Sequence, residues 1–117
     1  MENIKKTKAK NLEIWLAWLA TNHSHTQRVW LIIAKKNSSI ESISMSEAIA
    51  GALCYGWVDS RKKGIDKDTY MVYFTPRRPN SQWSQANKTL VEKLIKDGLM
   101  ATPGLEAINL AKDKGHY

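Results

Sequence analysis

The chain has 117 residues, of which 43% are hydrophobic and 25% charged, and its formal net charge is +7 at pH 7. This composition is typical of one globular domain and excludes a disordered or membrane-spanning class. A single cysteine excludes an internal disulfide, and no apolar run approaches the roughly 18 residues that span a bilayer. Because no secretory leader is recognisable, we expect a cytoplasmic protein.

The N-terminal segment 1–10 contains four lysines and one glutamate. Short basic ends of this kind are usually solvated and mobile. We therefore predict a flexible basic tail over residues 1–10, whose removal leaves stability almost unchanged. The remaining residues, 11–117, should form a single domain.

The first elements of that domain are predicted by the spacing of apolar residues. Residues 11–20 carry apolar side chains at helical spacing after Asn11, a residue suited to capping a helix. The apolar, β-branched run 29–34 predicts a central strand covered on both faces. A polar cluster between the two predicts a loop.

A second helix should begin after Ser44, because Ser44 and Glu47 match a capping box. Gly56 follows its last turn and can adopt the left-handed conformation that ends a helix. Residues 57–62 and 70–75 then predict the two strands of a hairpin.

Alternation along the first strand of the hairpin would place Trp57, Asp59 and Arg61 on one face of the sheet. Asp59 and Arg61 would then be close enough to form an ion pair. This geometry would bring Arg61 toward the end of the second strand and the loop that follows it.

Two further helices complete the chain. Ser84 can cap a helix that ends at Gly98, and Pro103 suits the first turn of a last helix that ends before Gly115. The predicted order is α-β-α-β-β-α-α. We therefore predict an α+β fold with a three-stranded, antiparallel or mixed sheet and about four helices packed on it.

The segment 74–84 is the richest in groups that bind ligands. It contains Arg77 and Arg78 between two prolines, followed by Trp83. Guanidinium groups are planar forks that suit carboxylates and phosphates, and prolines restrict the loop that carries them. The segment therefore predicts an anion contact. A purely structural role, in which the arginines bind carbonyls or nearby acids, is an equally open interpretation.

The candidate ligand-binding residues combine cations with an acid and two aromatic walls. They are Arg61, Arg77, Arg78, Asp59, Trp57 and Trp83. No catalytic residue and no cofactor is predicted. A metal site is not predicted either, because the three histidines lack cysteine or paired carboxylate neighbours at ligand spacing.

Two alternative functions stay open at this point. An enzyme acting on a small anionic or phosphorylated substrate could use Asp59 as a base, with Ser60 and with Arg77 as charge stabiliser. A nucleic-acid binder would suit the net charge and the five tryptophans. We disfavour nucleic acid as a partner, because much of the excess charge falls in segment 1–10 and no binding motif is present.

Two segments carry a family resemblance: Ala-Leu-Cys-Tyr-Gly-Trp-Val-Asp at 52–59 and Phe-Thr-Pro-Arg-Arg at 74–78. With Gly-Leu-Met at 98–100 and Thr-Pro-Gly-Leu at 102–105, the chain resembles the YdeI/OmpD-associated, bacteriocin-protection family. The resemblance implies a stress-tolerance role against antimicrobial peptides and association with an envelope porin, and it implies no catalytic residue or cofactor. We therefore predict a non-catalytic module that binds an anionic ligand or protein partner, with its oligomeric state open.

Overall fold

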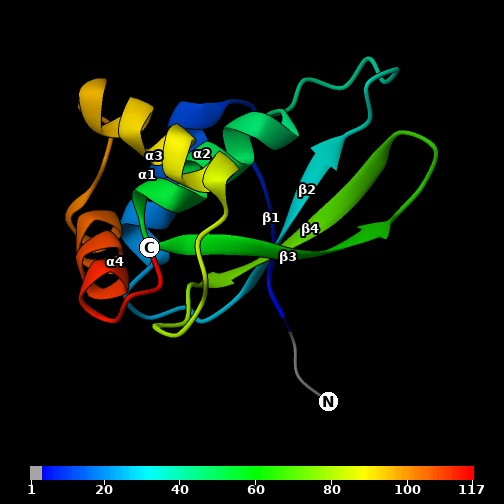
Figure 1. Cartoon of the computed structure of the whole chain (residues 1–117). Coiled ribbons are helices and arrows are strands. Elements are labelled where there is room, and N and C mark those ends of the chain that lie inside the picture. Colours follow the sequence, from blue (N-terminus) through cyan, green and yellow to red (C-terminus); the bar gives the residue numbers. More distant parts are fainter. Residues whose placement is uncertain (1–3) are drawn as a thin grey trace.

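The computed structural model describes residues 4–117 and shows four strands and four helices (Figure 1). In chain order the elements are β1 (Lys6–Lys8), α1 (Leu12–Asn22), β2 (Val29–Ala34), α2 (Met45–Cys54), β3 (Trp57–Gly64), β4 (Thr69–Pro76), α3 (Gln85–Lys96) and α4 (Thr102–Asp113). The α+β class and the four helices are confirmed. Within these residues no helix is long and apolar enough to cross a membrane.

The sheet has four strands in the order β1-β2-β4-β3, so the prediction of three strands was one short. β2 pairs with β4 and β4 with β3 in antiparallel fashion, which confirms the hairpin. β1 pairs with β2 in parallel, and the sheet is therefore mixed. Of the two sheet types predicted, the mixed one is the type that forms.

The additional strand corrects the prediction of a flexible tail over residues 1–10. Residues 6–8 pair with β2, and the amide of Trp30 donates to the carbonyl of Lys5 at 2.9 Å. Ala9 is buried, and its carbonyl accepts from the amide of Ile43. Because backbone hydrogen bonds hold this segment in the sheet, its polar side chains do not predict a strand. The part of the predicted tail at residues 1–3 lies outside the described residues.

The predicted helix caps are confirmed. Ser44 and Glu47 form the reciprocal capping box of α2. The side chains of Asn11 and Ser84 accept from backbone amides in the first turns of α1 and α3. These bonds satisfy amides that the helix itself leaves without partners, which is why short polar residues mark each start.

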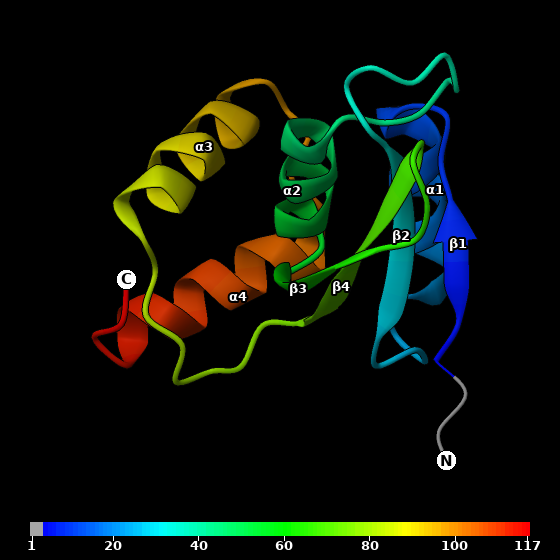
Figure 2. The same ribbon diagram turned by 90° about the vertical axis from the view of Figure 1, so that its right-hand side faces the viewer.

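Helices α1 and α2 pack on one face of the sheet, and α3 and α4 pack against α2. Figure 1 shows the helices gathered on one side, and Figure 2, turned by 90°, shows α1 behind β2. On this covered face, Val29, Leu31 and Ile33 of β2 are buried together with Val72 and Phe74 of β4. The large apolar side chains of α1 and α2 pack against them, which makes this layer the main core.

The other side of the sheet is the open face, which carries Trp30 and Ile32 of β2 and Tyr73 of β4. Burial alternates along β2, and the side chains that β2 contributes to this face are only half-buried. The prediction that β2 is covered on both faces is therefore wrong. All four helices lie on one side, so an apolar run that looked like a fully buried strand is only partly covered.

A bulge in β3 changes which face its side chains occupy. Asp59 pairs with Phe74, whereas Lys62 pairs with Val72, so the register shifts by one residue between them. The shift moves Arg61 to the open face, opposite to Asp59. The expected face shared by Asp59 and Arg61 is therefore wrong, because strict alternation does not survive a bulge.

A second core lies between α2, α3 and α4. It contains Cys54, Trp83, Val91, Leu94 and Ile108. Burial raises the pKa of the Cys54 thiol to about 11, so the thiol stays protonated near neutral pH and is a weak nucleophile. This core fixes α4 beside the loop that follows β4.

Candidate functional site: a cleft between the arginine loop and α4

The arginine loop, residues 77–84, begins where β4 ends and leads into α3. The amide of Arg77 donates to the carbonyl of Gly56 at 2.8 Å, and the amide of Ser81 donates to the carbonyl of Arg78. Gly56 has a φ of +73°, a conformation that a residue with a Cβ seldom adopts. The turn after α2 therefore positions the start of the arginine loop.

Helix α4 is held against the same turn by close backbone contacts. The amide of Ala101 donates to the carbonyl of Cys54 at 3.0 Å. A Cβ on Gly104 would lie 2.4 Å from the carbonyl oxygen of Cys54, so only glycine permits this approach. The Pro-Gly start of α4 therefore sets the distance between the helix and the arginine loop.

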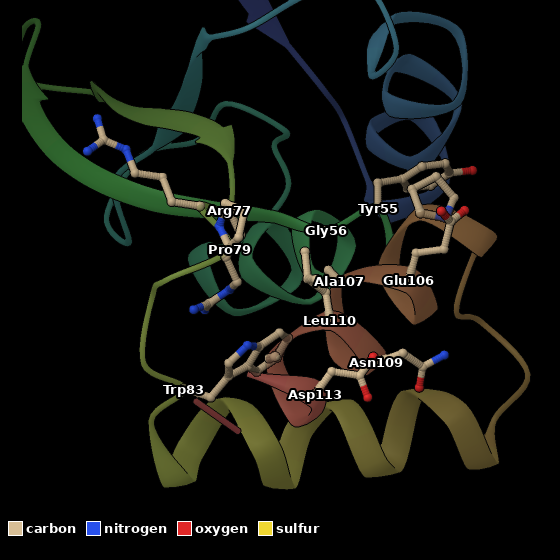
Figure 3. Close-up of a pocket in the computed structure, with 13 residues that line it drawn as sticks. Tyr55, Gly56, Arg77, Pro79, Trp83, Glu106, Ala107, Asn109, Leu110 and Asp113 are labelled. Atoms are coloured by element: carbon tan, nitrogen blue, oxygen red, sulfur yellow. The ribbon is translucent and has the colours of Figure 1, made fainter. Parts of the chain in front are cut away.

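A cleft of about 490 Å³ separates the arginine loop from α4. Figure 3 shows the loop residues on one side and the side chains of α4 on the other. The loop and the turn before β3 contribute Tyr55, Gly56, Arg77, Arg78, Pro79 and Trp83. The α4 side includes Pro103, Glu106, Ala107, Asn109, Leu110, Ala111 and Asp113. The volume is within the range of small-molecule sites.

Arg77 is half-buried and is held in place by several contacts. Its guanidinium carbon lies 4.1 Å from the centre of the Trp83 ring, and its Nη1 donates to the hydroxyl of Ser81. Burial lowers the pKa of Arg77 from its ordinary value, and the Asp59 carboxylate partly offsets that change. Arg77 stays charged, because a guanidinium is not deprotonated in proteins.

Two N–H groups at this wall of the cleft are left without partners. The Nε of Arg77 and the Nε1 of Trp83 are buried, and no side-chain or backbone group among residues 4–117 accepts from either. A buried donor without an acceptor costs about 1–3 kcal/mol, so native proteins rarely leave one unmet. Both residues line the cleft. Because both atoms are buried, a ligand oxygen would reach them only after a small shift of the Arg77 and Trp83 side chains.

Trp83 is anchored by the C-terminal segment as well as by the second core. Its amide donates to the carbonyl of His116 at 3.1 Å, and its ring lies 5.4 Å from that of Tyr117. The side chain of Gln82 is hydrogen-bonded to the Nδ1 of His116 at 2.8 Å. The C-terminal segment therefore holds the end of the arginine loop that carries Trp83.

The opposite wall carries acids. Glu106, Asn109 and Asp113 are exposed residues that line the cleft from α4 (Figure 3). Arg78 is also exposed and belongs to the loop side. The lining of the cleft therefore combines two arginines with two carboxylates and several apolar side chains.

The structure brings together three of the six predicted site residues: Arg77, Arg78 and Trp83. Trp57 is fully buried in the main core, where its ring meets that of Trp18 edge-on, and it is not a wall of the cleft. Asp59 is half-buried on the covered face and acts on Arg77 through its charge. Arg61 lies on the open face of the sheet.

The sequence analysis missed the wall formed by α4. Glu106, Asn109 and Asp113 are spaced i, i+3 and i+7, so they lie on one stripe of the helix. That spacing was a usable signal. An exposed polar stripe usually faces solvent, however, and only the docking of α4 turns it toward the arginine loop.

Among residues 4–117, no group of three His, Cys, Asp and Glu side chains is arranged to hold a metal ion. The fold is a small α+β domain, and its cleft between the arginine loop and α4 is lined by polar and apolar residues together. The chain belongs to the family described as Domain of unknown function (DUF8412), whose model matches residues 7–107. Comparison with curated proteins and with solved structures gives no match. Membership of the YdeI/OmpD-associated family stays a prediction.

Proposed function

We propose that the protein is a non-catalytic binding module that holds a small ligand by its carboxylate or phosphate group in the cleft. The observation that carries this proposal is the pair of buried, unpartnered donors, Arg77 Nε and Trp83 Nε1. An anionic oxygen would accept hydrogen bonds from both groups and neutralise the desolvated guanidinium. Charge-assisted bonds of this kind are about twice as strong as neutral ones.

The two arginines contribute differently to binding. Arg77 is fixed by Ser81 and Trp83, so little side-chain entropy is lost when the ligand arrives. Arg78 is exposed and supplies a second charge at the rim of the cleft. The first provides a preorganised contact and the second attracts the anion from solution.

The carboxylates of Glu106 and Asp113 restrict the class of ligand. A ligand with several negative charges would be repelled by this wall, whereas one with an anionic end and a cationic or donor group would suit both walls. A short cationic peptide with a free C-terminal carboxylate has this chemistry. Such a ligand agrees with the role in antimicrobial-peptide tolerance that the family resemblance implies, and the porin association remains part of the same proposal.

The alternative of an enzyme finds no support in this geometry. Neither Asp59 nor Ser60 lines the cleft that contains Arg77. The hydroxyl of Ser60 instead donates to the carbonyl of Tyr73 at 3.4 Å on the hairpin. The three groups that a catalytic interpretation requires are therefore not gathered around one hollow.

Thermal stabilisation by matched ligands tests the proposal. We would compare a short lysine-containing peptide as the free acid and as the C-terminal amide, with acetate and phosphate alongside. A ligand that binds only the folded state raises the melting temperature, and at equal concentration the tighter ligand raises it more. We expect the free acid to stabilise the protein more than the amide does.

Two variants that remove the same charge provide the control. Arg78→Gln removes an exposed cation at the rim of the cleft, whereas Arg61→Gln removes one on the open face. We expect binding of the free acid to weaken several-fold in Arg78→Gln and to stay unchanged in Arg61→Gln. Equal weakening in both variants would contradict the proposal, because it would show attraction by the overall charge alone.

A further inference from the structure

The open face of the sheet carries an aromatic surface that no helix covers. Trp30 and Tyr73 are cross-strand partners on this face, with ring centres 5.0 Å apart and a tilt of 51°. Both side chains are half-buried, so part of each ring is accessible. A half-buried aromatic pair outside the main core needs an explanation, because that core lies on the other face.

Arg61 lies over this aromatic pair. Its guanidinium carbon is 4.5 Å from the centre of the Tyr73 ring and 5.4 Å from that of Trp30. The bulge in β3 places Arg61 here, and the residue is exposed. The guanidinium and the two rings therefore form one cluster of planar groups on the open face.

The edge strands add positive charge on both sides of that surface. β1 and β3 contain five basic residues and one acid, Asp59. Lys6 is the register partner of Trp30, Lys8 that of Ile32, and Lys63 that of Met71, so these three lysines share the open face. The acid is the partner of Phe74 and lies on the covered face.

The same face continues into a hollow of about 340 Å³. Its apolar lining includes Ile32, Ala34 and Ile40, and Lys8 and Lys10 stand at its border with one acid, Glu41. Ile32 is two residues from Trp30 along β2, so the hollow adjoins the aromatic pair. It is large enough to receive one planar ring.

We propose that the open face binds single-stranded nucleic acid, with bases stacked on Trp30, Tyr73 and Arg61 and phosphates held by Lys6, Lys8 and Lys63. Aromatic side chains and guanidinium planes stack unpaired bases, and flanking cations follow the backbone. A duplex would not expose its base faces to such a surface. An acidic protein would use the cations and leave the stacking surface without a role.

This face is separate from the cleft. A flexible tail would have kept much of the positive charge away from any aromatic group, which is why the sequence alone disfavours nucleic acid. The structure incorporates Lys6 and Lys8 into β1, where they border the aromatic surface. The charge and the stacking groups are thereby on one face.

Fluorescence anisotropy of a labelled oligothymidylate of about 12 nucleotides tests this proposal, a length within the range that small sheet platforms cover. We expect saturable binding that weakens steeply between about 50 mM and about 200 mM salt. A blunt duplex of the same length should bind at least about tenfold more weakly, because its bases are already stacked.

Variants separate stacking from overall charge. Tyr73→Ala and Trp30→Ala should each weaken binding about tenfold, as expected for loss of one stacked base. Arg61→Gln should weaken it by a similar factor, whereas Arg78→Gln, which removes the same charge on the cleft side, should leave it nearly unchanged. Circular dichroism melts verify that each variant is folded, and Arg61→Gln, at an exposed position, keeps the test valid if an aromatic variant unfolds.

Three results would overturn the proposal. The first is absence of oligothymidylate binding at low salt. The second is an equal loss of affinity in Arg61→Gln and Arg78→Gln, which would show a nonspecific charge effect. The third is displacement of the oligothymidylate by polyglutamate at the same charge concentration as by unlabelled oligothymidylate. That result would make the face a site for acidic proteins.

Discussion

Two arginines of this chain lie over aromatic rings, and the contrast between them separates the two faces of the molecule. Arg77 lies 4.1 Å from the ring centre of Trp83, and Arg61 lies 4.5 Å from that of Tyr73. The distances are alike. Arg77 is half-buried beside a buried tryptophan, whereas Arg61 is exposed above half-buried rings.

The difference in burial determines what each pair can do. Desolvation lowers the pKa of Arg77, and its Nε has no acceptor among residues 4–117, so this pair belongs to the packed fold and, in our proposal, to the anion site. The guanidinium of Arg61 stays in contact with solvent and is part of the surface of the open face. The same kind of contact is therefore part of a packed wall in one case and of an accessible surface in the other.

The largest expected difference is in the unfolding free energy that is lost when Trp83 or Trp30 is replaced by alanine. Trp83 is 6% exposed and packs in the second core, so Trp83→Ala should cost about 3–5 kcal/mol of unfolding free energy. Trp30 is only half-buried, and Trp30→Ala should cost less than about 2 kcal/mol. Urea denaturation of both variants measures the two values. Equal losses would remove the distinction between the two pairs.

Replacing each arginine should also change the unfolding free energy unequally, with the larger loss at Arg77, but the difference is smaller than for the two tryptophans. Arg77→Met leaves the hydroxyl of Ser81 and the carbonyl of Gln82 without a donor, at a cost of about 1–2 kcal/mol. Arg61→Met should stay within about 0.5 kcal/mol of the wild type, as surface changes usually do. The midpoints of chemical denaturation provide the comparison. A neutral Arg77→Met with a destabilised Arg61→Met would reverse our assignment of the two sites.

The smallest expected loss of stability comes from removing β1, the strand at the border of the open face. Deletion of residues 1–8 removes β1 and its bonds to β2, so we expect a loss of about 1 kcal/mol, the net value of one or two backbone hydrogen bonds. The control is Lys6→Gln with Lys8→Gln, which keeps the strand and removes its charge. A deletion that leaves the melting temperature unchanged would restore the flexible tail expected from the sequence.

Local signals in the sequence predicted most of the fold. Ser44 and Ser84 mark helix starts by bonds within one turn, and Gly56 has the positive φ expected at the end of α2. The apolar runs of β2 and β4 predicted the two inner strands. Each of these features depends on neighbours a few residues away, which is why they could be recognised without a structure.

The missed features depend on contacts between distant segments. β1 has polar side chains and is held by the backbone of β2, so no pattern predicted it. Arg61 changes face because of a bulge, and α4 becomes a wall of the cleft only when Gly104 meets Cys54. In the candidate site, Arg77, Arg78 and Trp83 were recognisable because one short loop carries them all.

The most direct test of the central claim is a titration followed through the two unpartnered donors. In a ¹H–¹⁵N spectrum, the indole N–H of Trp83 and the Nε–H of Arg77 can be observed separately from those of Trp30 and Arg61. Addition of the free-acid peptide should shift the Trp83 and Arg77 signals together, saturably, while the Trp30 and Arg61 signals stay in place. Unchanged Trp83 and Arg77 signals at peptide concentrations that raise the melting temperature would contradict binding at these donors.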